Sequence, residues 1–165
     1  MLTHELLLIQ ADVAGFTELY RDTTKPSVQK ILFDTCRNKF DHFRLVTGTT
    51  PIKTRTDYEP GGTMLLSTGD ITGRITSHGS DSLGRWTYTK FQTRSQSHVC
   101  IISAYQPCRT QLSPSNIVYN QQYSLLSLPL LTNLQNNLPR VVDPRKTFIA
   151  DLTMFIQDFQ KEKCW

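Results

Sequence analysis

The chain lacks any hydrophobic run long enough to span a membrane. The N-terminal apolar stretch Leu6-Leu7-Leu8-Ile9 is far shorter than the roughly 20 apolar residues of a transmembrane helix. It also lacks the charged flank and the small-residue cleavage site of a signal peptide. We therefore expect no membrane partner, and a nuclear or cytoplasmic protein.

The sequence also lacks the residue spacings of zinc sites and of serine-hydrolase sites. Its four cysteines form no C-x-x-C pair and have no Cys/His spacing of a zinc site, so they are expected to be thiols in a reducing compartment. The four histidines show no pattern of a triad or a metal cage, and Ser103 lacks the glycines of a G-x-S-x-G elbow.

Length and composition predict a globular chain with a mild preference for anionic partners. At 165 residues with 38% hydrophobic content, the chain is long enough for one domain with its own core. The net charge of +4 is compatible with binding a phosphate backbone. The basic residues are dispersed, however, and a solvated surface is the alternative interpretation; those in or beside predicted loops are Lys53, Arg55, Arg85, Lys90, Arg94, Arg109, Arg140, Arg145 and Lys146.

Short β-branched and aromatic runs between Gly61 and Pro107 predict consecutive antiparallel strands. Turn-forming residues separate them at Gly69-Asp70, in the sequence DSLG and in the sequence QTRSQS. The run ITGRITSH is read as one of these strands, starting at Ile71. The pattern predicts an α+β protein with an antiparallel sheet as its scaffold.

Helical and extended segments flank this region. We expect a strand at Val13 to Phe16 that delivers Glu18 to its end, and a helix that starts at Asp143-Pro144, with the aspartate as N-cap. The remaining expectations are a helix at 3–11, a helix at 26–40, a strand at 43–46, loops at 47–60 and 106–119, and a helix at 120–137 that Pro129 breaks or kinks.

The order of four short motifs resembles the endonuclease/exonuclease/phosphatase family. These motifs are an apolar run ending at Glu18, Gly61-Gly62, Gly84-Arg85-Trp86, and an apolar run into Ser103-Ala104-Tyr105-Gln106-Pro107. The chain looks most like the endonuclease portion of retrotransposon polyproteins. This resemblance implies part of a four-layer α/β sandwich, of which the chain should hold most of one sheet with its helices.

The resemblance also implies site residues for a Mg²⁺-dependent attack on DNA. It assigns Glu18 as a metal ligand and Tyr105 as a hydrogen-bond donor beside the scissile phosphate, with Arg109 and Arg85 contacting nucleic acid. The alternatives are a surface glutamate, a tyrosine of the core or rim, and an ordinary loop arginine at 109. For Arg85 the alternative is an ion pair with Asp81 while Trp86 lies in the core.

Several family motifs are missing. No Asp-x-Asn occurs, the one Asp-His pair (Asp41-His42) lies far upstream of the expected place, and no Asn-bearing strand precedes Met1. We therefore expect one truncated domain over 1–165 that is catalytically incomplete and lacks flanking segments of the same polyprotein. The alternatives are a non-catalytic nucleic-acid-binding protein and the product of a remnant open reading frame.

Overall fold

The computed structural model describes residues 10–51, 59–108, 118–132 and 142–161. Contacts divide the chain into two compact units, Met1–Tyr105 and Gln106–Trp165, which are described separately below. The expectation of a single truncated domain over 1–165 stays a prediction.

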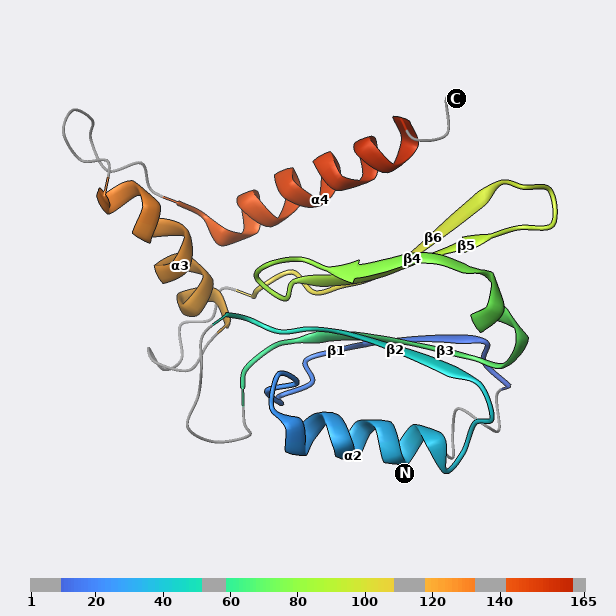
Figure 1. Ribbon diagram of the computed structural model, residues 1–165. Coiled ribbons are helices and arrows are strands. Elements are labelled where there is room, and N and C mark those ends of the chain that lie inside the picture. Colours follow the sequence, from blue (N-terminus) through green and yellow to red (C-terminus); the bar gives the residue numbers. More distant parts are fainter. Residues whose placement is uncertain (1–9, 52–58, 109–117, 133–141, 162–165) are drawn as a thin grey trace. The chain divides into compact units, whose positions relative to one another are not determined.

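The first unit contains two three-stranded antiparallel sheets. The first sheet has the strand order β1-β3-β2 and consists of β1 (Val13–Thr17), β2 (Phe43–Gly48) and β3 (Thr63–Thr68). Every residue of β3 is buried, because this central strand is covered on both faces. Figure 1 shows helix α2 (Pro26–Arg37) along one face of the first sheet and the second sheet along the other.

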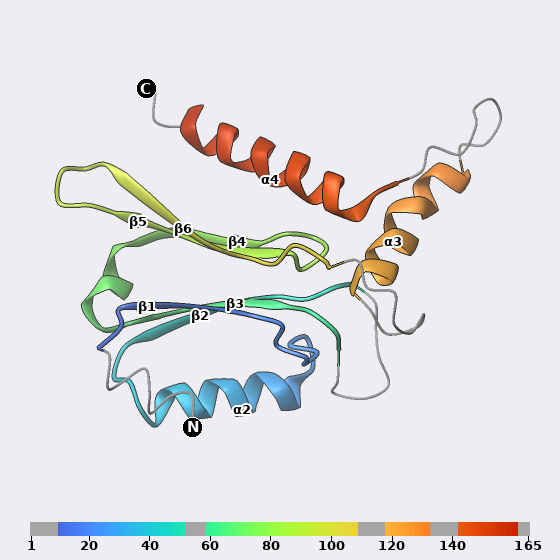
Figure 2. The ribbon, with the colours of Figure 1, turned by 180° about the vertical axis from the view of Figure 1, so that it is seen from behind.

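The second sheet has the order β4-β5-β6 and is a simple meander. A 3₁₀ helix, η1 (Gly69–Arg74), leads out of the first sheet into β4 (Ile75–Ser80). One short turn then connects β4 to β5 (Trp86–Gln92), and a second connects β5 to β6 (His98–Ala104). Figure 2 shows the two sheets stacked face to face from behind. The predicted α+β class with antiparallel sheets is therefore confirmed.

Two details of the predicted strand region are wrong. The segment Ile71–Arg74 is not strand, because Gly69 has a left-handed φ of 67° and Thr72 donates a hydrogen bond of 2.8 Å to the Gly69 carbonyl, which winds the chain into η1. In addition, β3 does not join the strands that follow it. It pairs with β1 and β2, so the chain holds two sheets of three strands instead of most of one.

The layer between the two sheets is built from small and hydroxyl-bearing residues. A Cβ added at Gly15 would lie 3.2 Å from the Ser103 Cβ, and one added at Gly48 would lie 3.0 Å from the Ser80 Cβ, so the sheets approach closely at both glycines. Hydroxyl groups fill much of the remaining space, and the fully buried ones include Thr63, Thr87 and Thr89 at 0% exposure. Leu65 and Phe91 are among the buried apolar residues of the two sheets.

Helix α2 covers the outer face of the first sheet. Pro26 occupies its first turn, where a missing N–H costs nothing, and Val28 and Cys36 are its buried residues. Burial raises the pKa of the Cys36 thiol, which therefore stays protonated near neutral pH. The expected helix at 26–40 is confirmed, as are the strands predicted at 13–16 and 43–46.

The second unit consists of two helices, α3 (Val118–Thr132) and α4 (Pro144–Lys161). The predicted start of α4 is confirmed, since the Asp143 carboxylate accepts a hydrogen bond of 2.9 Å from the Arg145 N–H. Helix α3 continues past Pro129 to Thr132. The segments 3–9 and 133–137, for which helices were predicted, lie outside the described residues. Among the described helices, none combines the length and the apolar content needed to cross a membrane.

Candidate functional site

The strands that carry Glu18 and Tyr105 end at the same end of the two-sheet sandwich. The Ser103 hydroxyl on β6 donates a hydrogen bond of 3.1 Å to the Phe16 carbonyl on β1, which ties these strands together near their last residues. The Thr63 hydroxyl, at the start of β3, donates to the Gly84 carbonyl at 3.3 Å, just before β5. Since β1 is antiparallel to β3 and β6 is antiparallel to β5, both strands end here. We call this the glutamate end.

Glu18 lies on a strained stretch of backbone that follows β1. Glu18 and Tyr20 have left-handed φ angles of 56° and 53°, a conformation that costs a residue with a side chain about 1–2 kcal/mol. The stretch is held by backbone hydrogen bonds to two glycines, from the Leu19 N–H to the Gly62 carbonyl at 3.5 Å and from the Tyr20 N–H to the Gly61 carbonyl at 3.1 Å. The Glu18 side chain itself is exposed to solvent.

Gly61 and Gly62 are needed for this arrangement. Both have positive φ angles, 81° and 85°. A Cβ at Gly62 would lie 3.5 Å from the Leu19 Cβ, which is an ordinary van der Waals contact, so the need for glycine comes from the backbone angle. The Gly-Gly motif of the sequence therefore positions the backbone beside Glu18.

Tyr105 follows the last residue of β6. Its backbone N–H donates a hydrogen bond of 2.8 Å to the Arg85 carbonyl, which extends the β5–β6 pairing by one step beyond the strand. The side chain is partly exposed. A phenol in this position can donate a hydrogen bond to a phosphate oxygen without ionising.

Arg85 is buried and paired, as its alternative interpretation predicted. Its guanidinium donates two hydrogen bonds to the Asp81 carboxylate, from Nε at 2.6 Å and from Nη2 at 3.0 Å, and the side chain is only 3% exposed. The guanidinium also lies 4.8 Å from the centre of the Trp86 ring, and Trp86 is buried. These contacts fix the turn before β5 and leave no exposed guanidinium at position 85 for nucleic acid.

The same turn requires a glycine at position 84. Gly84 has a φ of 68°, and a Cβ there would lie 2.7 Å from the Thr49 Cα and 2.8 Å from the Thr49 carbonyl oxygen. The chain that leaves β2 thus passes directly against the chain that enters β5. The Gly84-Arg85-Trp86 motif is explained by this contact and by the Asp81 pairing.

Three other carboxylates near these segments are buried. Asp22 is 1% exposed and accepts hydrogen bonds from the Thr24 N–H at 3.0 Å and from the Thr24 hydroxyl at 2.6 Å, which forms an Asx turn ahead of α2. Asp81 binds Arg85, and Glu59 is 2% exposed. Glu18 is thus the exposed carboxylate among these four. In the sequence, Asp22-Thr23-Thr24 just before Lys25-Pro26 is the local signal of this Asx turn.

The family resemblance implies a bound Mg²⁺, and the described side chains show what kind of Mg²⁺ site they could form. Within the described ranges, no group of three or more His, Cys, Asp and Glu side chains is placed to hold a metal ion. Mg²⁺ in nucleotide-processing sites often uses only one or two protein carboxylates together with waters and substrate phosphates. Glu18 fits that sparse kind of site as a single oxygen ligand, whereas a cage made of protein ligands does not fit.

The remaining predicted contact, Arg109, lies outside the described residues. Comparison of the chain with protein-family models, with curated proteins and with solved structures finds no match. The resemblance to the endonuclease/exonuclease/phosphatase family, the magnesium site and the DNA partner therefore stay predictions.

Proposed function

We propose that the chain is part of a metal-dependent phosphodiesterase of the retroelement DNA endonuclease type. In this proposal it binds nucleic acid at the glutamate end but does not cleave it without further segments. The observation that carries the proposal is that Glu18 and Tyr105, the two residues assigned to phosphate chemistry, follow strands that end side by side, joined by the bond from the Ser103 hydroxyl to the Phe16 carbonyl at 3.1 Å.

Each residue has a distinct part in phosphate binding. The Tyr105 hydroxyl donates a hydrogen bond to a non-bridging phosphate oxygen and thereby orients the phosphodiester. The Glu18 carboxylate would supply one oxygen ligand to a bound Mg²⁺. When bound, the metal would polarise the phosphoryl oxygen and stabilise the leaving oxygen. Because the Ser103–Phe16 bond fixes the two strand ends, the residues after them approach the phosphate from a rigid frame.

The backbone strain at Glu18 supports a role beyond filling the surface. A left-handed φ at a residue with a long side chain persists where the surroundings impose it, and such residues concentrate at functional sites. An exposed glutamate gains nothing from this conformation through burial. Strain combined with exposure is typical of a side chain held for contact with a ligand.

We expect no cleavage because the neighbouring carboxylates already take part in an ion pair and in turn hydrogen bonds. Phosphodiester hydrolysis needs ligands or bases that activate a water as well as a group that binds the metal. Asp81 is neutralised by Arg85, and Asp22 is committed to the turn ahead of α2. Neither of these two carboxylates is available to activate a water at Glu18, and we therefore expect binding without cleavage.

The test combines DNA binding and DNA nicking by the purified full chain. We expect affinity for a short DNA duplex that falls steeply as salt rises, because phosphate contacts release counterions. In a buffer that contains Mg²⁺, we expect each site variant to weaken binding by about tenfold. Glu18→Gln loses a charged metal ligand, and Tyr105→Phe loses a hydrogen bond to a charged group. The matched controls are Asp34→Asn on α2 and Tyr123→Phe on α3, both at exposed positions, which should bind as the wild type does.

Two results would contradict the proposal. DNA affinity that is absent at low salt, or that is equal in the wild type and both site variants, removes the assigned roles of Glu18 and Tyr105. Mg²⁺-dependent nicking of supercoiled plasmid that disappears in Glu18→Gln would support the family but refute the expected inactivity. The competing candidate, a remnant open reading frame product, predicts insoluble protein or a thermal melt without a cooperative transition.

A further inference from the structure

A pocket with a volume of about 490 Å³ lies at the end of the sandwich opposite the glutamate end. Here β3 passes into η1, and the turn between β5 and β6 closes the second sheet, so we call it the hairpin end. Pockets of this size hold small molecules, and they combine apolar walls with a few polar groups. The apolar part of the wall is formed by Ile71, Phe91, Val99 and Ile101.

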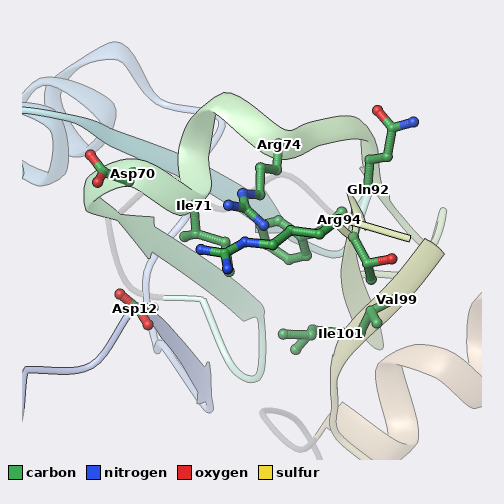
Figure 3. A pocket seen from close by; sticks show the side chains of 10 residues that line it. Asp12, Asp70, Ile71, Arg74, Gln92, Arg94, Val99 and Ile101 are labelled. Carbon is green, nitrogen blue, oxygen red and sulfur yellow. The ribbon is translucent and has the colours of Figure 1, made fainter. Parts of the chain in front are cut away.

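Two arginines enter this pocket from different elements. Arg74 lies in the last turn of η1, and Arg94 lies in the turn between β5 and β6. Figure 3 shows both side chains extending over the pocket. Both are exposed, and neither makes a hydrogen bond or an ion pair with any residue that the structure describes. They contrast with Arg85, whose guanidinium is buried and donates two hydrogen bonds to Asp81.

Two carboxylates limit what the pocket can accept. Asp12 and Asp70 also line it, and Figure 3 shows them on the side toward which the two guanidiniums extend. Guanidinium groups bind a carboxylate through paired, parallel hydrogen bonds. A carboxylate bound by Arg74 and Arg94 carries one negative charge, whereas a second negative charge placed beyond the guanidiniums would be repelled by Asp12 and Asp70. The charges favour a small monoanion over nucleic acid.

We propose that the hairpin end binds a small monoanionic carboxylate with a flat or branched apolar body. Its carboxylate lies between Arg74 and Arg94, and its body contacts the wall of Ile71, Phe91, Val99 and Ile101. Val99 is 47% exposed, which leaves apolar surface for a ligand to cover. This site is separate from the proposed phosphate site, because the two lie at opposite ends of the sandwich.

The probe for this site is 2-naphthoate, titrated into the full chain and followed by ¹H–¹³C NMR. We expect a dissociation constant of about 1 mM, typical of a ligand with roughly a dozen heavy atoms. Shifts should concentrate on the methyl signals of Ile71, Val99 and Ile101. The double variant Arg74→Gln/Arg94→Gln should lose about tenfold or more in affinity. Arg21→Gln removes one exposed arginine of the first unit outside this pocket and should bind as the wild type does.

Two related compounds test the chemistry. 2-Naphthalenemethanol keeps the ring but not the charge and should bind at least tenfold more weakly. 2-Naphthyl phosphate carries a second charge and should bind no tighter than the carboxylate. Equal binding of the alcohol, shifts that map elsewhere, or full affinity in the double variant would overturn the proposal. A double variant with normal 2-naphthoate binding but weakened DNA binding would likewise overturn it and assign the arginines to nucleic acid.

Discussion

The glycine at position 84 permits the closest backbone approach near the glutamate end, and its replacement by alanine tests this packing. The new Cβ would lie 2.7 Å from the Thr49 Cα and 2.8 Å from the Thr49 carbonyl oxygen. These are backbone atoms, which cannot swing away as a side chain can. Gly84 also has a φ of 68°, which alanine adopts at a cost.

Two other glycines separate the cost of the positive φ from the cost of the steric clash. Gly69 has a similar φ of 67° but no atom within 4 Å of the added Cβ, and Gly73 likewise has no such atom. The φ term is about 1–2 kcal/mol, reduced by roughly 0.4–1 kcal/mol because alanine also restricts the unfolded chain. Gly69→Ala should therefore cost about 1 kcal/mol, whereas Gly73→Ala, which has neither a positive φ nor a clash, should stabilise the fold by roughly 0.4–1 kcal/mol. Gly84→Ala adds an overpacking term of about 1–3 kcal/mol, for a total of about 3 kcal/mol.

Chemical denaturation with urea measures all three variants, and a thermal melt should place Gly84→Ala roughly 10 °C below the wild type. The denaturant dependence should be unchanged, because the clash alters the native state and not the exposed area. A Gly84→Ala variant that is no less stable than Gly69→Ala would refute the close approach between Gly84 and Thr49.

Three further predictions concern strain, buried hydroxyls and a buried thiol. Glu18→Gly should be more stable than Glu18→Gln by about 0.5–1 kcal/mol, since glycine adopts the φ of 56° without strain; a less stable glycine variant in urea unfolding would contradict this. Thr89→Val should raise the unfolding free energy by about 1 kcal/mol, because the Thr89 hydroxyl is buried with no partner among the described residues. Thr63→Val should lower the unfolding free energy by a similar amount, because it removes the hydrogen bond to the Gly84 carbonyl. Destabilisation by both variants would mean that a buried water satisfies Thr89. Cys36 should react with iodoacetamide at pH 8 more slowly than the exposed Cys108, because burial raises the pKa of the Cys36 thiol and keeps it protonated as the pH approaches 9. The difference in rate should vanish in denaturant. Equal rates in the native protein would contradict the burial of Cys36.

The strands were predictable because their local patterns match their environments. Val13 to Thr17 is a short apolar run, and Trp86 to Gln92 is rich in aromatic and β-branched residues. The turns between the strands have the glycine, aspartate and serine that turns favour. The start of α4 was predictable for the same reason, since Asp143-Pro144 defines the cap and first turn locally. In these cases the decisive interactions lie within a few residues of one another.

The predictions of strand placement were wrong where residues distant in the sequence determine the structure. The sequence TMLLST reads as a strand in either sheet, and only its pairing with β1 and β2, which lie earlier in the chain, places it in the first sheet. The run ITGRITSH contains β-branched residues throughout, yet the left-handed φ at Gly69 diverts its first half into η1. That diversion places Arg74 in the pocket at the hairpin end, so the pocket was not foreseeable from a strand assignment.

The proposed phosphate site was only partly readable from the sequence. Motif order brought out Glu18 and Tyr105, and the structure places their strands at one end. The state of Arg85 depends on the Asp81 carboxylate four residues earlier, and this pairing was foreseen only as an alternative. The strain at Glu18 has no sequence signature, because it depends on backbone hydrogen bonds to Gly61 and Gly62, more than 40 residues away in the chain.

The most direct test of the proposed function is the effect of Mg²⁺ on DNA affinity at constant ionic strength, compared between the wild type and Glu18→Gln. Because the metal would bridge Glu18 and a phosphate, Mg²⁺ should tighten DNA binding by the wild type, and by the Asp34→Asn control, by about fivefold or more. The Glu18→Gln variant should show no such gain. An equal Mg²⁺ response in Glu18→Gln, or none in the wild type, would contradict the role assigned to this carboxylate.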